Sequence, residues 1–93
     1  MTLDRLINIG FGNAVNTSKV VAVVNPEAAP VKRMVQQAKE NGRVIDATQG
    51  RRTKSVLITQ EDHIILSALQ ADTIIKRFSN MPFTEMRREE DES

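Results

Sequence analysis

Hydrophobic and polar positions alternate in short blocks along the chain, and the spacing within each block predicts one kind of element. Short apolar runs bounded by turn-forming residues are typical of β-strands. They predict strands at residues 3–9, 18–24, 43–47, 54–59 and 63–68. The last run contains Ile64-Ile65-Leu66 without alternation, which suits a strand that is covered on both faces.

Two other segments have apolar residues at helical spacing. The first follows Pro30, which a helix tolerates in its first turn, and Gly42 is well placed to end it. The second is short and carries Ile74 and Phe78, and Asp72-Thr73 can cap its beginning. Between the first two strands, the segment 10–13 has two glycines around Phe11, which predicts a tight turn with Phe11 tucked into a neighbouring surface.

The predicted order of elements is β-β-α-β-β-β-α, which mixes strands with helices. The connections are short, and short connections favour antiparallel pairing. We therefore predict a single α+β domain over residues 1–80, with a small, mostly antiparallel sheet and two helices packed on one side of it. Residues 81–93 are rich in charge and are expected to form a disordered tail.

Charge is unevenly distributed, although the net charge is only +1. Residues 31–54 hold seven Lys and Arg against two acidic residues, whereas residues 85–93 hold two Arg against five acidic residues. In the net charge, the acidic tail thus cancels most of the positive charge of residues 31–54. Such asymmetry indicates a polyanion as partner more clearly than the total charge does.

The most basic segment is the polar turn that joins the apolar runs at 44–45 and 56–58. There Gly50 precedes Arg51 and Arg52, and Lys54 follows closely. A turn that only reversed the chain would need Gly50 and little else. Two adjacent arginines on a loop held between strands offer paired forks for phosphate or carboxylate, so the segment predicts an anion site with DNA as the first partner to consider. Other cations that could join it are Lys32, Arg33 and Arg43, although the first two also suit a solvated helix face.

Composition argues against several other classes of protein. The chain has one histidine, His63, and no cysteine, and its Ser and Thr residues lie in no nucleophile motif, so we expect neither an enzyme nor a metal site. No cofactor and no small-molecule substrate are expected. The chain has three Phe and no Tyr or Trp, too few aromatic side chains for stacking on bases. This argues against an RNA-binding protein. Without a visible secretory signal or an apolar run of membrane length, we expect a soluble, cytoplasmic protein with no membrane contact.

Four segments together resemble the RemA family, small bacterial proteins named as regulators of extracellular-matrix genes. They occur in order and at the expected spacing: residues 8–13 (NIGFGN), 26–33 (PEAAPVKR), 45–54 (IDATQGRRTK) and 65–68 (ILSA). The resemblance covers about residues 3–79 and leaves the acidic tail outside. It implies a DNA-binding transcriptional regulator with a fold similar to LytTR-type domains. It further implies a ring-shaped homo-oligomer, a heptamer or stacked rings, that presents basic loops and bends or wraps duplex DNA.

The same resemblance implies which residues contact DNA. The positions map onto Lys19, Arg51 and Arg52, which would bring Lys19 to the same surface as the arginine pair. Lys19 stands where the family usually has arginine, so it keeps the charge but loses the bidentate fork that base readout would need. Asn13 and the run 30–33 are shared features that we assign to folding or ring contacts. One rival role stays open, a scaffolding module whose arginines pair with carboxylates across a subunit interface.

Overall fold

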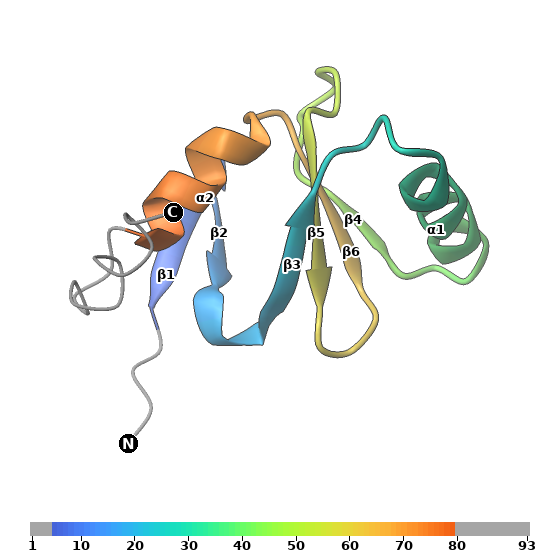
Figure 1. Ribbon diagram of the computed structural model, residues 1–93, viewed down its shortest axis with the longest axis horizontal. Helices are drawn as coiled ribbons and strands as arrows, with labels where there is room; N and C mark the ends of the chain where they lie inside the picture. The colour runs from blue at the N-terminus through green and yellow to red at the C-terminus, as the bar shows by residue number, and fades with distance from the viewer. Residues whose placement is uncertain (1–4, 80–93) are drawn as a thin grey trace, which may run out of the picture.

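The computed structural model describes residues 5–79, which form six β-strands, two α-helices and one short 3-10 turn (Figure 1). Their bounds are β1 (Leu6–Gly10), β2 (Asn13–Asn16), η1 (Thr17–Lys19), β3 (Val20–Val24), α1 (Ala29–Glu40), β4 (Val44–Asp46), β5 (Ser55–Thr59), β6 (Ile64–Ser67) and α2 (Ala71–Ser79). The α+β class and the order of the predicted elements are confirmed, and β2 is an additional short strand that the sequence did not predict. The tail expected at 81–93 lies outside the described residues.

The strands of residues 5–79 form two sheets. β1 and β2 make an antiparallel hairpin, and the other strands make a main sheet in the order β3-β5-β6-β4. The pairs β3–β5 and β5–β6 are antiparallel, whereas β4 runs parallel to β6. The main sheet is therefore mostly antiparallel, as predicted. The basic loop between β4 and β5 is not a hairpin tip, however, because β6 lies between these two strands.

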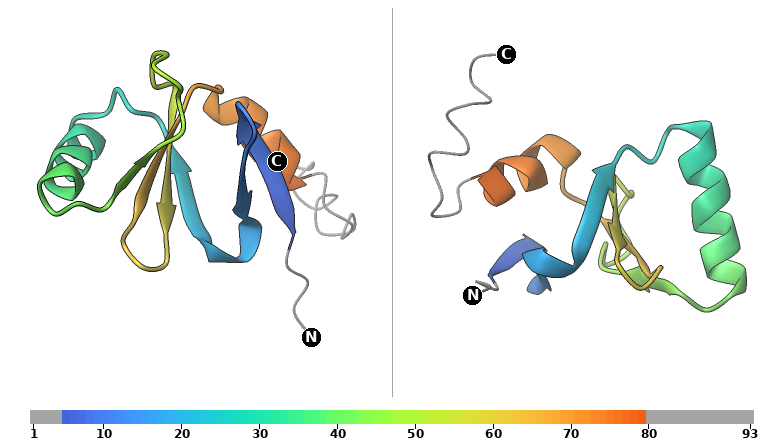
Figure 2. Two further views of the ribbon diagram at one scale, coloured as in Figure 1. Left: turned by 180° about the vertical axis from the view of Figure 1, so that it is seen from behind. Right: turned by 60° about the horizontal axis from the view of Figure 1, so that its bottom comes forward.

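The two helices lie on opposite faces of the main sheet, so the expectation that both pack on one side was wrong. Val56 and Leu66 belong to a core under α1, whereas Leu57 and Ile65 belong to a second core that includes Ile74 of α2. Successive side chains of a strand point to opposite faces, so one apolar run can fill two cores. Figure 2 shows α1 and α2 on opposite sides of the main sheet from two further directions. The strand predicted to be covered on both faces is confirmed, since every residue of β6 is buried.

The first helix begins and ends as its sequence predicts, and the second begins slightly earlier than predicted. Pro30 lies in the first turn of α1, and Gly42 follows its end with a φ of 70°. The backbone N–H of Arg43 then donates to the carbonyl oxygen of Ala38 at 2.8 Å, which closes the last turn. In α2, Asp72 lies within the first turn instead of capping the helix. Its negative charge there still interacts favourably with the positive end of the helix dipole. Neither helix within residues 5–79 is long and apolar enough to cross a membrane.

Candidate nucleic-acid interface

The basic loop, residues 47–54, lies at one end of the main sheet, where β3, β4 and β6 finish and β5 begins (Figure 1). We call this the loop end of the sheet, and the opposite end the far end. Both ends of the loop are bonded to β6. The backbone N–H of Ala47 donates to the carbonyl oxygen of Leu66 at 2.9 Å, and that of Lys54 to Ser67 at 2.8 Å. The loop is therefore held at both of its ends by the sheet.

The tip of the loop is a tight turn of the type I′ geometry. Gln49 and Gly50 both have positive φ, 55° and 79°, and the N–H of Arg51 donates to the carbonyl oxygen of Thr48 at 3.0 Å. Asp46 supports the turn, because its Oδ1 accepts the side-chain hydroxyl of Thr48 at 2.6 Å and its N–H at 2.9 Å. These bonds, the hydroxyl one first, hold the pKa of Asp46 below its usual value. The tip is thus shaped by one bond within the loop and by two bonds to Asp46, the last residue of β4.

Three cations of the loop, Arg51, Arg52 and Lys54, are exposed. The guanidinium carbon of Arg51 lies 5.2 Å from the centre of the Phe11 ring, whereas Arg52 Nη2 lies 3.6 Å from Glu27 Oε2. The two arginines therefore turn toward different neighbours. The pair between Arg52 and Glu27 is largely exposed to solvent on both sides. Such pairs contribute about 0–1 kcal/mol, so an incoming phosphate can displace Glu27 at small cost.

A groove runs from the loop toward α1. Its first part, about 160 Å³ in volume, is lined by Arg52, Lys54 and the segment 25–27. The second part, about 210 Å³, shares Pro26 and Thr53 with the first and continues along the surface of α1. The cations that line the whole groove come from the loop and the helix: Lys32, Lys39, Arg52 and Lys54. We call it the basic groove, and it adjoins the loop end at which both helices begin.

The turn between β1 and β2 lies beside the loop. Phe11 and Gly12 have φ values of 52° and 77° and connect the paired residues Gly10 and Asn13, so the predicted tight turn is confirmed. The side-chain Nδ2 of Asn13 donates to the carbonyl oxygen of Gly10 at 3.0 Å and to that of Ala47 at 3.5 Å. Asn13 thus joins this turn to the first residue of the basic loop. Phe11 is 46% exposed, so the expectation that it is tucked into a surface was wrong.

Sequence comparison places these features in a known family. The family model of the RemA-like proteins, described as "Extracellular matrix regulatory protein A-like", matches residues 6–78. The chain belongs to the RemA-like family. The resemblance inferred from the sequence motifs is thereby confirmed.

Relatives of the RemA-like chain have names that describe regulators. A "Putative regulatory protein" of Thermoanaerobacter sp. (strain X514) is 55% identical over 89 residues, which cover 95% of this chain and 93% of that protein. Another, of Alkaliphilus metalliredigens (strain QYMF), is 57% identical over 76 residues, 82% of each chain. A third, of Acetivibrio thermocellus (strain ATCC 27405), is 49% identical over 88 residues, 95% of each chain. The RemA-like chain is thus similar over most of its length to proteins named as regulators.

Lys19 lies away from the arginine pair in this RemA-like fold. It ends η1, just before β3, and its carbonyl oxygen accepts the N–H of Gln60 at 2.9 Å at the far end. Because β3 and β5 are antiparallel, the start of β3 pairs with the end of β5. Lys19 therefore lies about 14 Å along the strands from the start of β5, where the basic loop ends. Within one chain, the expectation that Lys19 shares a surface with Arg51 and Arg52 was therefore wrong.

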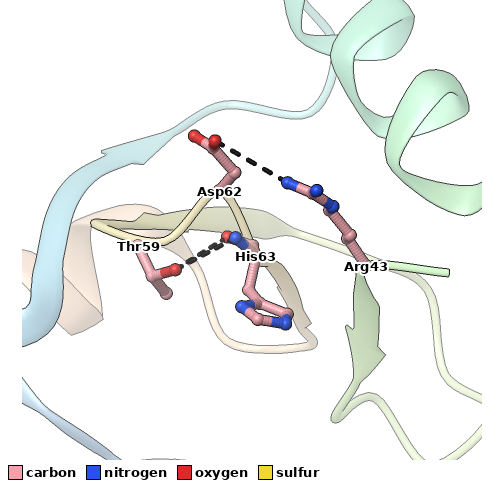
Figure 3. Close-up of polar contacts among 4 residues, drawn as sticks. All are labelled: Arg43, Thr59, Asp62 and His63. Atoms are coloured by element: carbon pink, nitrogen blue, oxygen red, sulfur yellow. Dashed lines mark hydrogen bonds and ion pairs between the residues drawn. The ribbon is translucent and has the colours of Figure 1, made fainter. Parts of the chain in front are cut away.

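Arg43 also belongs to the far end. Its Nη1 lies 3.7 Å from Asp62 Oδ2 in the turn between β5 and β6 (Figure 3). His63 is exposed beside it, and its backbone N–H donates to the hydroxyl oxygen of Thr59 at 3.1 Å. The histidine is thus a surface residue next to a strand.

Of the helix cations that the sequence singled out, Lys32 borders the basic groove, and Arg33 is exposed next to it on α1. Two further residues, Lys39 in the basic groove and Phe11 beside Arg51, were not predicted from the sequence as part of the candidate site. A signal for Lys39 existed, because it follows Lys32 by two helical turns and so shares its face. The contact between Phe11 and Arg51 has no local signal, since it joins two turns far apart in the sequence.

Proposed function

We propose that this chain is a transcriptional regulator that binds duplex DNA through the loop end of its sheet, acting as a homo-oligomeric ring. One observation carries the proposal: exposed Arg51, Arg52 and Lys54 stand on a loop whose tip and both ends are hydrogen-bonded. A phosphate backbone would meet these cations already in place, so little ordering cost would be incurred on binding. The relatives' names, which describe regulatory proteins, support a regulatory and non-enzymatic role.

The chemistry of the loop end suits phosphates. Arginine forks bind phosphate oxygens in pairs, and Lys54 with the groove cations Lys32 and Lys39 adds point charges nearby. Both α1 and α2 begin at this end, and the positive ends of their dipoles favour anions there. Phosphate contacts of this kind give affinity and orientation, while sequence preference would come partly from how easily the DNA bends.

A ring would compensate for the small number of cations that one chain presents to DNA. Aligned copies raise one another's effective concentration on the same DNA. The outermost strands β3 and β4 carry exposed apolar residues, Val21 at 64% and Ile45 at 50% exposure. Apolar side chains on opposite edges suit head-to-tail contacts, which form a ring when the rotation from one copy to the next closes. Lys19 could then reach the same DNA from a neighbouring copy, if the far end of one subunit lies beside the loop end of the next.

Charge reversal at the loop tests the proposal. Arg51→Glu/Arg52→Glu should bind duplex DNA at least about tenfold more weakly in fluorescence anisotropy, because two phosphate contacts become repulsive. The matched control is Arg5→Glu/Lys76→Glu, which makes the same change in net charge at exposed residues before β1 and within α2. It should bind nearly as the parent does. A folded arginine variant that keeps the parent's affinity would rule out the loop as the DNA site.

The scaffolding alternative has one observation in its favour, because Arg52 already pairs with a carboxylate, Glu27. Under that role, the arginine variant would change the oligomer mass in multi-angle light scattering, and any loss of DNA binding would follow from it. An unchanged mass with lost binding favours the DNA role. Competition between duplex DNA and RNA of the same sequence separates DNA binding from RNA binding.

A further inference from the structure

We propose that Phe11 is a positioning residue for Arg51, whose guanidinium it holds in the orientation that meets DNA. The inference rests on the proposed function and adds the β1–β2 turn to the binding surface. It would make the loop end a two-part interface, in which one turn carries the cation and the other orients it.

The conformation of Phe11 is the first observation. Its φ of 52° lies in the left-handed region, which a bulky residue rarely adopts. A turn of this geometry favours Asn, Asp or Gly at the position. Phe11 gains only partial burial in return, because it is 46% exposed. Strained residues that packing does not explain occur preferentially at functional sites.

The second observation is the neighbour of the ring. The guanidinium carbon of Arg51 lies 5.2 Å from the ring centre, within the cation–π range of about 6 Å. A carboxylate beside an arginine competes with phosphate for its positive charge, as Glu27 does at 3.6 Å from Arg52 Nη2. An aromatic ring attracts the positive charge of the guanidinium without forming conventional hydrogen bonds with its N–H groups. The fork of Arg51 therefore stays available for phosphate while its side chain is restrained.

The third observation is that Phe11 and Arg51 both lie on turns that hydrogen bonds and packing hold in place. Asn13 Nδ2 donates to the carbonyl oxygen of Phe11 at 3.3 Å as well as to that of Ala47 in the loop. Leu69 lies under the turn, since a β-carbon added at Gly10 would stand 3.4 Å from its side chain. The two turns are thus joined by the Asn13 amide and by the contact of Phe11 with Arg51, which makes a preorganised pair.

The test separates folding from binding with Phe11→Asn and Phe11→Tyr. Asparagine suits the left-handed position, so Phe11→Asn should unfold at an equal or higher urea concentration than the parent. It should nevertheless bind duplex DNA about 2- to 5-fold more weakly for each copy engaged, the loss expected of an exposed cation–π contact. Phe11→Tyr keeps an aromatic face and should bind as the parent does. A Phe11→Asn variant with the parent's affinity overturns the inference.

A second comparison uses Arg51→Met. If Phe11 acts through Arg51, adding Phe11→Asn to Arg51→Met should cause no further loss of affinity. An equal loss in both backgrounds means that Phe11 acts on DNA by itself, which contradicts the positioning role. The proposed function is judged separately by Arg51→Glu/Arg52→Glu: if that variant loses DNA binding while Phe11→Asn keeps it, only the role of Phe11 fails.

Discussion

At the scale of single residues, the basic loop depends on Asp46 and Thr48. The Asp46 carboxylate accepts the hydroxyl and the backbone N–H of Thr48, and these bonds lower its pKa. A carboxyl group whose pKa is lower in the folded state stabilises that state when ionised. Its contribution is present above the unfolded pKa, about 3.9, and is lost as the pH falls through the lower folded value.

This linkage gives a prediction for Asp46→Ala. The variant should be less stable than the parent at neutral pH, because Thr48 loses its acceptor. Urea unfolding over a pH series should show the difference in free energy of unfolding shrinking below about pH 4, as the parent's carboxylate becomes protonated. A difference that stays constant down to pH 2 would mean that the charge of Asp46 does not support the turn.

At the scale of elements, the tip of the loop depends on its left-handed positions. Gly50 has a φ of 79° and has open space around an added β-carbon, so an alanine there would meet backbone strain without a clash. We expect Gly50→Ala to lower the free energy of unfolding by about 1–2 kcal/mol and to weaken DNA binding, because the arginines follow directly. Gln49→Asn is the control, since asparagine tolerates the φ of 55° at position 49 better than glutamine does. Equal stability of the alanine variant and the parent in urea would contradict this account.

The sequence predicted the elements better than their arrangement. The spacing of apolar residues located the longer elements. Strand β2 was missed because Val15 is its one buried residue, and a single apolar position does not make a recognisable strand pattern. The pairing of β4 with β6 depends on contacts across the sheet, which no local pattern encodes. The placement of the helices could have been predicted, because adjacent buried residues such as Val56 and Leu57 already require cover on both faces.

The candidate site was predicted in part for the same reason. Arg51, Arg52 and Lys54 were recognised because a local cluster of charge is visible in the sequence. Lys19 was misplaced, although it precedes β3 just as Lys54 precedes β5. The sequence predicted a mostly antiparallel sheet but not that β3 pairs with β5, and this pairing is what puts the two lysines at opposite ends of the sheet. Contacts between turns, such as those of Phe11 and Asn13 with the loop, require the folded structure.

At the scale of the whole molecule, the two ends of the main sheet differ in charge. The loop end joins the exposed arginine pair to the basic groove and to the beginnings of both helices. At the far end, the cations Lys19 and Arg43 are balanced by two acidic residues of the turn between β5 and β6, Glu61 and Asp62, and Asp62 is paired with Arg43. A molecule with a net charge of only +1 can therefore present a strongly cationic surface in one direction. In a ring, copies would add these surfaces together.

The measurement that tests the central claim most directly is the salt dependence of duplex DNA binding by the full-length protein. Each phosphate contact contributes about −0.9 to the slope of log K against log salt, so the three loop cations of one copy give about −3. A ring that engages two or more copies should give a slope steeper than about −5. A slope near −3 would contradict the joint action of several copies, and a flat response or no binding would contradict DNA recognition through the loop end.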